Sequence, residues 1–157
     1  MKCFDQMELF RISAEKYSGE LSASGRPNRW NIRGSYVIYA SASRSLATLE
    51  LVVHRSSILP GIRYNVMVIS VADDDRLVKQ LVIKELPDEW RRLAGYSRLQ
   101  EIGMKWYEEQ QSLLLKVPSV LIPNEYNYVI NTEHPDFKTN VRLIRQEEFF
   151  WDDRLIK

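Results

Sequence analysis

Glu50 is an isolated carboxylate in an arginine-rich segment, and this combination suggests where chemistry takes place. Between Leu21 and Ala72 the chain has six arginines, no lysine and no acid other than Glu50. These arginines are Arg26, Arg29, Arg33, Arg44, Arg55 and Arg63. The segment therefore carries a net charge of +5, whereas the rest of the 157-residue chain has 16 basic and 20 acidic residues. This asymmetry predicts a small anionic ligand bound by arginine, with one carboxylate reserved for another role.

The surroundings of Glu50 leave two roles open. Its neighbours in sequence and at helical spacing are apolar, and a buried carboxylate is costly unless it is paired. A structural pair with His54, four residues later, or with a core arginine is the commoner outcome for such a residue. Alternatively, Glu50 serves the reaction, and its being the only acid among six arginines favours this second role.

Arg29 is the arginine best placed to bind a phosphate. It precedes Trp30 and Asn31 in a loop that leads into a strand, where a guanidinium can bind a phosphate through two parallel hydrogen bonds. Trp30 would then place an indole beside the ligand for stacking, and Asn31 is assigned to the same binding site. The alternative is a surface arginine that lies over a tryptophan.

Two residues with hydroxyl groups complete the set of candidates. Tyr39 is the polar-tipped member of an apolar strand, so its ring either faces a ligand or packs in the core. Ser119 follows a proline in the run VPSVLIP, where its hydroxyl can donate a hydrogen bond. No metal site is expected, because His54 and His134 are too few and too far apart in sequence.

Together these residues predict an anion-binding pocket that contains one isolated carboxylate. NAD fits such a pocket, because arginines would hold its diphosphate and an aromatic side chain would stack on nicotinamide. The carboxylate would bind ribose hydroxyls and stabilise an oxocarbenium ion. Spacing alone does not select NAD over other phosphorylated ligands. The chain has no Walker loop, no GxGxxG and no Gly-x-Ser-x-Gly motif, which excludes the usual NTPase, Rossmann and serine-hydrolase classes.

Length and composition predict one domain that spans residues 1–157. A composition of 45% hydrophobic and 27% charged residues is typical of a globular protein, and the net charge of +1 argues against binding to nucleic acid or membrane. No run approaches the roughly 20 apolar residues of a membrane span, so a cytoplasmic location is expected. The single cysteine, Cys3, excludes an internal disulfide and a cysteine-based metal cluster.

The expected elements indicate an α+β fold, because strands outnumber helices and do not alternate regularly with them. Strands are expected at residues 7–12, 36–40, 62–71, 77–86, 113–123, 126–131 and 141–144. Helices are expected at residues 45–54, 87–93 and 97–111. Ser41 or Ser43 is expected to cap the first helix, whose apolar face is expected to hold Leu46, Leu49 and Val53 with Ala47 beside them. The strand at 62–71 alternates polar and apolar residues, as a half-buried strand does.

Seven short motifs occur along nearly the whole chain. They are LFRI at 9–12, RWNIRG at 29–34, VIYAS at 37–41, LATLELVVH at 46–54, IGMKW at 102–106, VPSVLIP at 117–123 and NYVINTEHPDF at 127–137. In their order and spacing the chain resembles the RES-domain toxins of bacterial RES–Xre toxin–antitoxin systems, a family named for an arginine, a glutamate and a serine. By this resemblance the family's arginine, tyrosine, glutamate and serine correspond to Arg29, Tyr39, Glu50 and Ser119.

The resemblance implies a fold like that of the ADP-ribosyltransferase toxins, a split mixed β-sheet with flanking helices and NAD in the cleft. Family members cleave the nicotinamide–ribose bond of NAD, some by hydrolysis or phosphorolysis and at least one by ADP-ribosylating a protein. The four corresponding residues would then be catalytic. One departure lies at the entrance to this site, where the family usually has Gly-Gly before Arg-Trp-Asn and this chain has Pro27-Asn28.

The resemblance also implies a partner. The toxicity of family members is blocked by an Xre-type, DNA-binding antitoxin that covers the active site, in a complex expected to hold more than one toxin copy. The toxin itself is expected to have no DNA-reading element. A non-catalytic interaction module is the alternative from another class, and retention of all four residues argues against it. A nuclease toxin would need a general acid–base pair or a metal cluster, and the sequence shows neither.

Overall fold

Seven strands form one mixed sheet in the computed structural model, which describes residues 5–54, 58 and 60–155. The strands lie in the order β4-β5-β6-β2-β1-β3-β7, and all neighbours are antiparallel except β4 and β5. Their bounds are β1 Gln6–Ala14, β2 Val37–Ser41, β3 Tyr64–Ala72, β4 Val78–Gln80, β5 Leu114–Pro118, β6 Tyr126–Asn131 and β7 Val141–Phe149. Cys3 and Arg55 lie outside the described residues.

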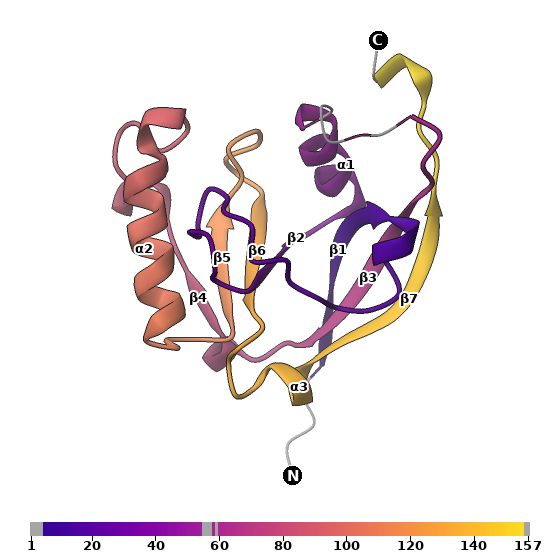
Figure 1. Ribbon diagram of the computed structural model, residues 1–157. Helices are drawn as coiled ribbons and strands as arrows, with labels where there is room; N and C mark the ends of the chain where they lie inside the picture. The colour runs from indigo at the N-terminus through magenta and orange to yellow at the C-terminus, as the bar shows by residue number, and fades with distance from the viewer. Residues whose placement is uncertain (1–4, 55–57, 59, 156–157) are drawn as a thin grey trace.

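Helices flank this sheet (Figure 1). The α-helices are α1 (Arg44–Val53), α2 (Tyr96–Glu108) and α3 (Phe137–Asn140). The short 3-10 helices are η1 (Glu15–Tyr17), η3 (Asp75–Leu77), η4 (Ile83–Glu85), η5 (Leu93–Gly95) and η6 (Asp153–Leu155). Within the described part of the chain, no helix is long and apolar enough to cross a membrane. The α+β class with a mixed sheet, predicted from the sequence, is confirmed.

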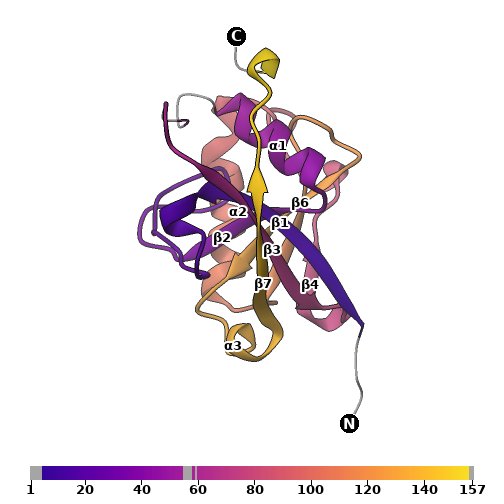
Figure 2. The same ribbon diagram turned by 90° about the vertical axis from the view of Figure 1, so that its right-hand side faces the viewer.

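The sheet is split between β1 and β2. These strands share a single register pair, Phe10 with Ser41, whereas β1 and β3 share nine. The sheet therefore consists of two halves, β4-β5-β6-β2 and β1-β3-β7, which diverge from this junction (Figure 1). Helix α1 contacts both β1 and β2, so it bridges the two halves, and Figure 2 shows it crossing one end of the sheet.

Strand β3 is buried on both faces, although alternation in its sequence predicted a half-buried strand. Met67, Ile69 and Val71 belong to the largest core cluster, which covers one face. Val66 and Val68 belong to a second cluster on the other face, together with residues of β1 and α1. The prediction was wrong because both faces of this half of the sheet are covered by other parts of the chain, which the pattern of one strand does not reveal.

Helix α1 turns a different face to the protein than the sequence predicted. Its cap is Ser43, one of the two expected residues, whose side chain accepts a hydrogen bond from the Leu46 amide at 3.1 Å. Leu46 and Ala47 are buried as predicted, but Leu49 and Val53 are 38% and 53% exposed, so the predicted apolar face was wrong at these two positions. The helix is rotated about its axis because its inner face must carry residue 50, one turn beyond residues 46 and 47, toward the sheet.

Helix α2 packs closely against the loop that precedes β2. Its buried residues are Leu99, Gly103 and Trp106, and two of them, Leu99 and Trp106, share a core cluster with Trp30 of that loop. A side chain at Gly103 would collide with the Trp30 carbonyl, because an added Cβ would lie 1.8 Å from that oxygen. Glycine therefore allows α2 to contact the loop backbone directly.

The segment before α2 is irregular, although the sequence predicted a strand at 77–86 and a helix at 87–93. Only the three residues of β4 pair with β5, and turns with short 3-10 helices follow. Trp90 is 5% exposed and Leu93 is 81% exposed, although the two would share one face of a helix at this spacing. Burial of Trp90 without Leu93 requires a turn here rather than a continuous helix.

Candidate active site

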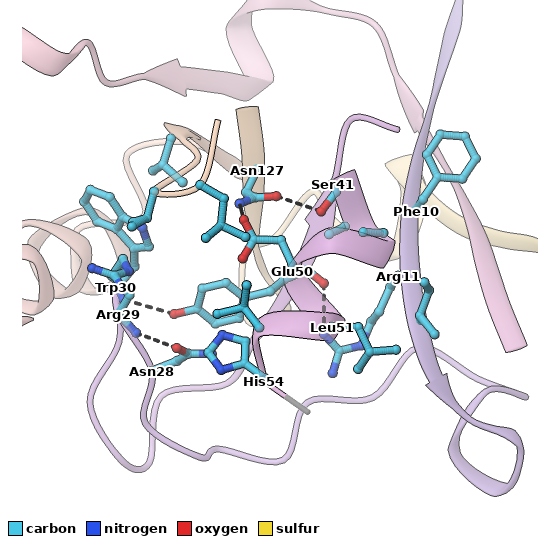
Figure 3. Close-up of a pocket in the computed structure, with 18 of the residues that line it drawn as sticks. Phe10, Arg11, Asn28, Arg29, Trp30, Ser41, Glu50, Leu51, His54 and Asn127 are labelled. Carbon is cyan, nitrogen blue, oxygen red and sulfur yellow. Dashed lines mark hydrogen bonds between the residues drawn. The ribbon is translucent and has the colours of Figure 1, made fainter. Parts of the chain in front are cut away.

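A pocket of about 320 Å³ lies where α1 crosses the junction between the two halves of the sheet. Its lining combines residues from β1, β2, α1, the loop before β2 and the end of β5 (Figure 3). The polar and aromatic residues that line it are Phe10, Arg11, Asn28, Arg29, Trp30, Tyr39, Ser41, Glu50, His54, Tyr96 and Asn127. The pocket thus brings together Arg29, Tyr39 and Glu50, which the sequence predicted to share a site.

Glu50 is held by two neutral hydrogen-bond donors. Its Oε1 atom accepts from the Ser119 hydroxyl at 2.9 Å and from the Asn127 side-chain amide at 2.8 Å. Its Oε2 atom has no hydrogen-bond partner among the described residues. Among the described residues, the structural pair with His54 or a core arginine, left open by the sequence, is not formed. One oxygen of the carboxylate is therefore fixed and the other is available to a ligand in the pocket.

Ser119 lies behind Glu50 rather than in the pocket lining. It is fully buried, and its Oγ atom accepts hydrogen bonds from the amides of Leu121 at 3.1 Å and Ile122 at 3.2 Å. With both lone pairs occupied, the single hydroxyl proton is directed to Glu50. The structure therefore connects Ser119 to the site through the carboxylate and not through direct exposure to a ligand.

A tight turn holds Arg29 and Trp30 between Asn28 and Asn31. The Asn28 amide donates to the Asn31 carbonyl at 3.0 Å, the reverse bond is 3.4 Å long, and the Asn28 side chain accepts from the Arg29 amide at 2.8 Å. Gln100 of α2 donates to both carbonyls of this turn, at 2.8 and 3.2 Å. Asn28 thus closes the turn with its own side chain.

The guanidinium of Arg29 is oriented without a carboxylate. Its Nη1 atom donates to the Trp90 carbonyl at 3.1 Å, and the group lies 4.5 Å from the centre of the Tyr96 ring. No acidic side chain of the described residues lies within salt-bridge distance of it. The positive charge is therefore available to an anionic ligand, and Tyr96 stabilises it through a cation–π contact.

Trp30 and Asn31 contribute to the site mainly from the protein interior. Trp30 lines the pocket but is only 3% exposed, and it belongs to the core cluster around α2, which leaves little of its indole for stacking. Asn31 is buried and does not line the pocket. Its side chain donates to the Arg26 carbonyl at 2.9 Å and so stabilises the loop.

Tyr39 fixes the position of the Arg29 turn. Its hydroxyl accepts a hydrogen bond from the Trp30 amide at 3.1 Å and donates to Asn31 Oδ1. Burial raises the pKa of the Tyr39 hydroxyl well above its ordinary value, so the group stays neutral. The ring lines the pocket, while the hydroxyl holds the loop that carries Arg29.

Arg11 is a second cation of the pocket, and the sequence analysis did not assign it. It projects from β1, donates from Nη1 to the Tyr39 carbonyl at 2.9 Å and has no carboxylate partner among the described residues. Burial lowers the pKa of Arg11 from its ordinary value. The signal in the sequence was a lone arginine in the apolar strand motif LFRI.

A larger cavity of about 650 Å³ adjoins the pocket and lies under the loop at 20–28. Arg11, Asn28 and Tyr39 line both cavities. The arrangement thus places an uncompensated cation at the boundary between two chambers, with one carboxylate in the first chamber. A ligand with a central anionic group and a part that develops positive charge near Glu50 fits this distribution.

Comparisons with known proteins agree with the resemblance seen in the sequence. The family described as RES domain matches residues 8–152. The chain is 31% identical over 95% of its length to Toxin Res of Yersinia enterocolitica, of which it covers 99%. It is 30% identical over 96% of its length to Toxin Res of Photorhabdus laumondii, of which it covers 98%. It is also 32% identical to the Prs ADP-ribosylating toxin of a Sphingobium species, with 88% of each chain covered.

Among solved structures, the fold is similar to a chain in the crystal structure of the M. tuberculosis MbcT–MbcA toxin–antitoxin complex. The TM-score is 0.67 at 16% identity, with 94% of this chain and 84% of the other chain covered. The expected ADP-ribosyltransferase-like fold, a split mixed sheet with flanking helices, is confirmed.

Proposed function

The chain belongs to the RES domain family, and we propose that it is a toxin of a toxin–antitoxin system that cleaves the nicotinamide–ribose bond of NAD. The observation that carries this proposal is the contrast between one carboxylate, held by neutral donors, and two arginines without acidic partners in the same pocket. The names of the Toxin Res relatives support the toxin assignment.

The two adjoining cavities suit a dinucleotide. The pocket of about 320 Å³ is at the small end of the range for ligand sites, which is roughly 300–1,000 Å³. It can hold the nicotinamide nucleoside, while the larger cavity offers room for the second nucleoside. Arg11, at the boundary, and Arg29 would bind the diphosphate that connects the two halves.

Glu50 would stabilise the transition state of bond cleavage. When the bond between the ribose C1′ and the nicotinamide nitrogen breaks, the bonding electrons leave with neutral nicotinamide and positive charge develops on the ribose. The free Oε2 of Glu50 would bind ribose hydroxyls and attract this charge, which exists only after cleavage begins. A nucleophile then adds to C1′ and releases its proton, so water yields ADP-ribose and phosphate yields ADP-ribose 1-phosphate.

A protein acceptor is the second candidate, and one relative favours it. The chain is 32% identical to a protein named Prs ADP-ribosylating toxin, a name that describes transfer of ADP-ribose to a protein. Both reactions use the same pocket and the same transition state and differ only in the nucleophile.

Product analysis tests the proposal and separates these branches. Purified protein incubated with NAD should release nicotinamide, and its expression without an antitoxin should arrest growth and deplete cellular NAD. Free ADP-ribose identifies hydrolysis, ADP-ribose 1-phosphate in phosphate buffer identifies phosphorolysis, and a labelled protein in lysate identifies transfer. Failure to release nicotinamide under all three conditions would refute the proposal.

We also propose an Xre-type antitoxin as the partner, in a complex with more than one toxin copy. The fold is similar to a chain from a toxin–antitoxin complex, and the basic pocket suits an acidic or C-terminal segment of a partner. Antitoxin and NAD should then compete for the toxin. Simultaneous binding of both, measured by fluorescence titration, would exclude occlusion of the pocket as the mechanism.

Arg29→Ala should weaken NAD binding by about 1.5–3 kcal/mol, because one charge-assisted contact with the diphosphate is lost. The dissociation constant can be measured by calorimetry in a Glu50→Gln background, where turnover of the ligand is expected to be slower by about 10²-fold or more. Arg33→Ala is the matched control, because Arg33 is exposed and lies outside both cavities. Equal affinities for the two variants would remove Arg29 from the diphosphate site.

A further inference from the structure

The hydrogen bonds around Glu50 extend beyond the residues identified from the sequence. Asn127, the second residue of β6, donates from its side-chain amide to Glu50 Oε1 at 2.8 Å. The other end of the same amide, Oδ1, accepts from the Ser41 hydroxyl at 2.7 Å. Ser41 and Asn127 are also register partners in the pairing of β2 with β6. A continuous chain of bonds thus leads from β2 through Asn127 to the carboxylate.

These bonds define which way the Asn127 amide points. With Ser41 donating to its oxygen, the amide nitrogen must face Glu50. The reversed amide would place an oxygen at 2.8 Å from a carboxylate oxygen, which is repulsive. Ser119, the other donor, has its lone pairs occupied by backbone amides and so has only its proton to offer. Glu50 Oε1 is therefore held by two donors of fixed direction.

Neither donor carries a charge, and this matters for the chemistry. An arginine bound to Glu50 would fix the carboxylate equally well, but it would cancel the negative charge that the transition state requires. Amide and hydroxyl donors stabilise the anion and leave its charge uncompensated. They occupy one oxygen and direct the other to the pocket.

This series of hydrogen bonds begins at the junction between the two halves of the sheet. Ser41 is the β2 residue of the single register pair that joins the two halves of the sheet. It is 4% exposed, and its hydroxyl faces Asn127 beneath α1 (Figure 3). The position of the carboxylate is thus set by the junction on which the pocket is built, as well as by its own helix.

We infer that Asn127, oriented by Ser41, is a positioning residue that holds one oxygen of the Glu50 carboxylate and aims the free oxygen at the ribose of the substrate. This inference rests on the proposed cleavage of NAD for its kinetic test. It has a second test, given below, that does not depend on any activity.

Two variants of Asn127 separate positioning from a structural role. Asn127→Leu removes the donor at similar size and should lower kcat about 10- to 100-fold, with the KM for NAD changed less than about threefold. Asn127→Asp keeps the shape but places a second carboxylate beside Glu50. Protonation of the pair then becomes easier, so the acid limb of the pH profile of kcat should move up by about one pH unit or more.

The control variant is Asn124→Asp, which adds the same charge to an exposed residue of the loop between β5 and β6. The other titratable groups that line the pocket are Arg11, Arg29, Tyr39, His54 and Tyr96. Because these groups are present in every variant, only a difference between Asn127→Asp and the control is attributed to Asn127.

The carboxyl carbon signal of Glu50, followed by NMR against pH without substrate, provides the independent readout. Its midpoint should move to higher pH in Asn127→Asp and not in Asn124→Asp. Should Asn127→Leu fail to fold, Ser41→Ala replaces it, with a smaller loss of kcat in the same direction. Unchanged kcat and an unchanged carboxyl titration would overturn the inference. A wild-type protein that cleaves no NAD would refute the proposed function, while the titration would still decide the role of Asn127.

Discussion

Glu50→Gln should abolish toxicity and lower turnover of NAD by about 10²-fold or more, the usual loss when one electrostatic stabiliser is removed. Glutamine has nearly the same size as glutamate, and its carbonyl oxygen can still accept the hydrogen bonds from Ser119 and Asn127. The fold and much of the NAD affinity should therefore be retained. What is lost is the negative charge, which contributes most when the ribose becomes cationic.

A structural role for Glu50 predicts the opposite pattern. If the carboxylate only satisfied buried donors, its replacement would lower the melting temperature and leave turnover per folded molecule nearly intact. Both quantities can be measured on one preparation, by calorimetry and by nicotinamide release. Glu101→Gln, an exposed residue of α2, is the control for loss of one negative charge. A destabilised but fully active Glu50→Gln would exclude Glu50 from catalysis.

Local patterns in the sequence predicted most of the fold. The strand at 126–131 was predicted with its observed bounds, and the start of α1 followed from the capping preference of serine. The failures depend on tertiary packing. The exposed face of α1 and the turns at 87–93 were mispredicted because burial there is decided by distant segments, which hydrophobic spacing along one segment does not report.

The site residues also divide into those that the sequence indicates and those that only the packing of the strands reveals. Arg29, Tyr39 and Glu50 could be assigned to one pocket because charge composition and the motifs drew attention to them. Arg11 and Asn127 are polar residues of β1 and β6, and the role of such a residue becomes visible only when the strand's neighbours in the sheet are known. Ser119 was predicted as a site residue through the resemblance, and the structure shows that it lies behind Glu50 and donates a hydrogen bond to its carboxylate.

Gly103→Ala should destabilise the protein, although alanine is a better helix former than glycine. In the interior of an exposed helix this substitution ordinarily stabilises by about 1 kcal/mol. Here an added Cβ would lie 1.8 Å from the Trp30 carbonyl oxygen and 2.8 Å from its carbon. Both are backbone atoms, so α2 or the Arg29 turn must move as a unit. Overpacking of this kind costs about 1–3 kcal/mol in the free energy of unfolding.

The same displacement should weaken NAD binding, because α2 positions Arg29 from two sides. Tyr96, at its first turn, lies against the guanidinium, and Gln100 donates to both carbonyls of the turn. Gly19→Ala is the matched control, since a Cβ there would meet nothing within 4 Å. Gly103→Ala should lower the free energy of unfolding measured with denaturant and raise the dissociation constant for NAD. Gly19→Ala should change neither quantity. If Gly103→Ala were instead stabilised with unchanged affinity, helix propensity would outweigh the contact, and α2 would not determine where Arg29 lies.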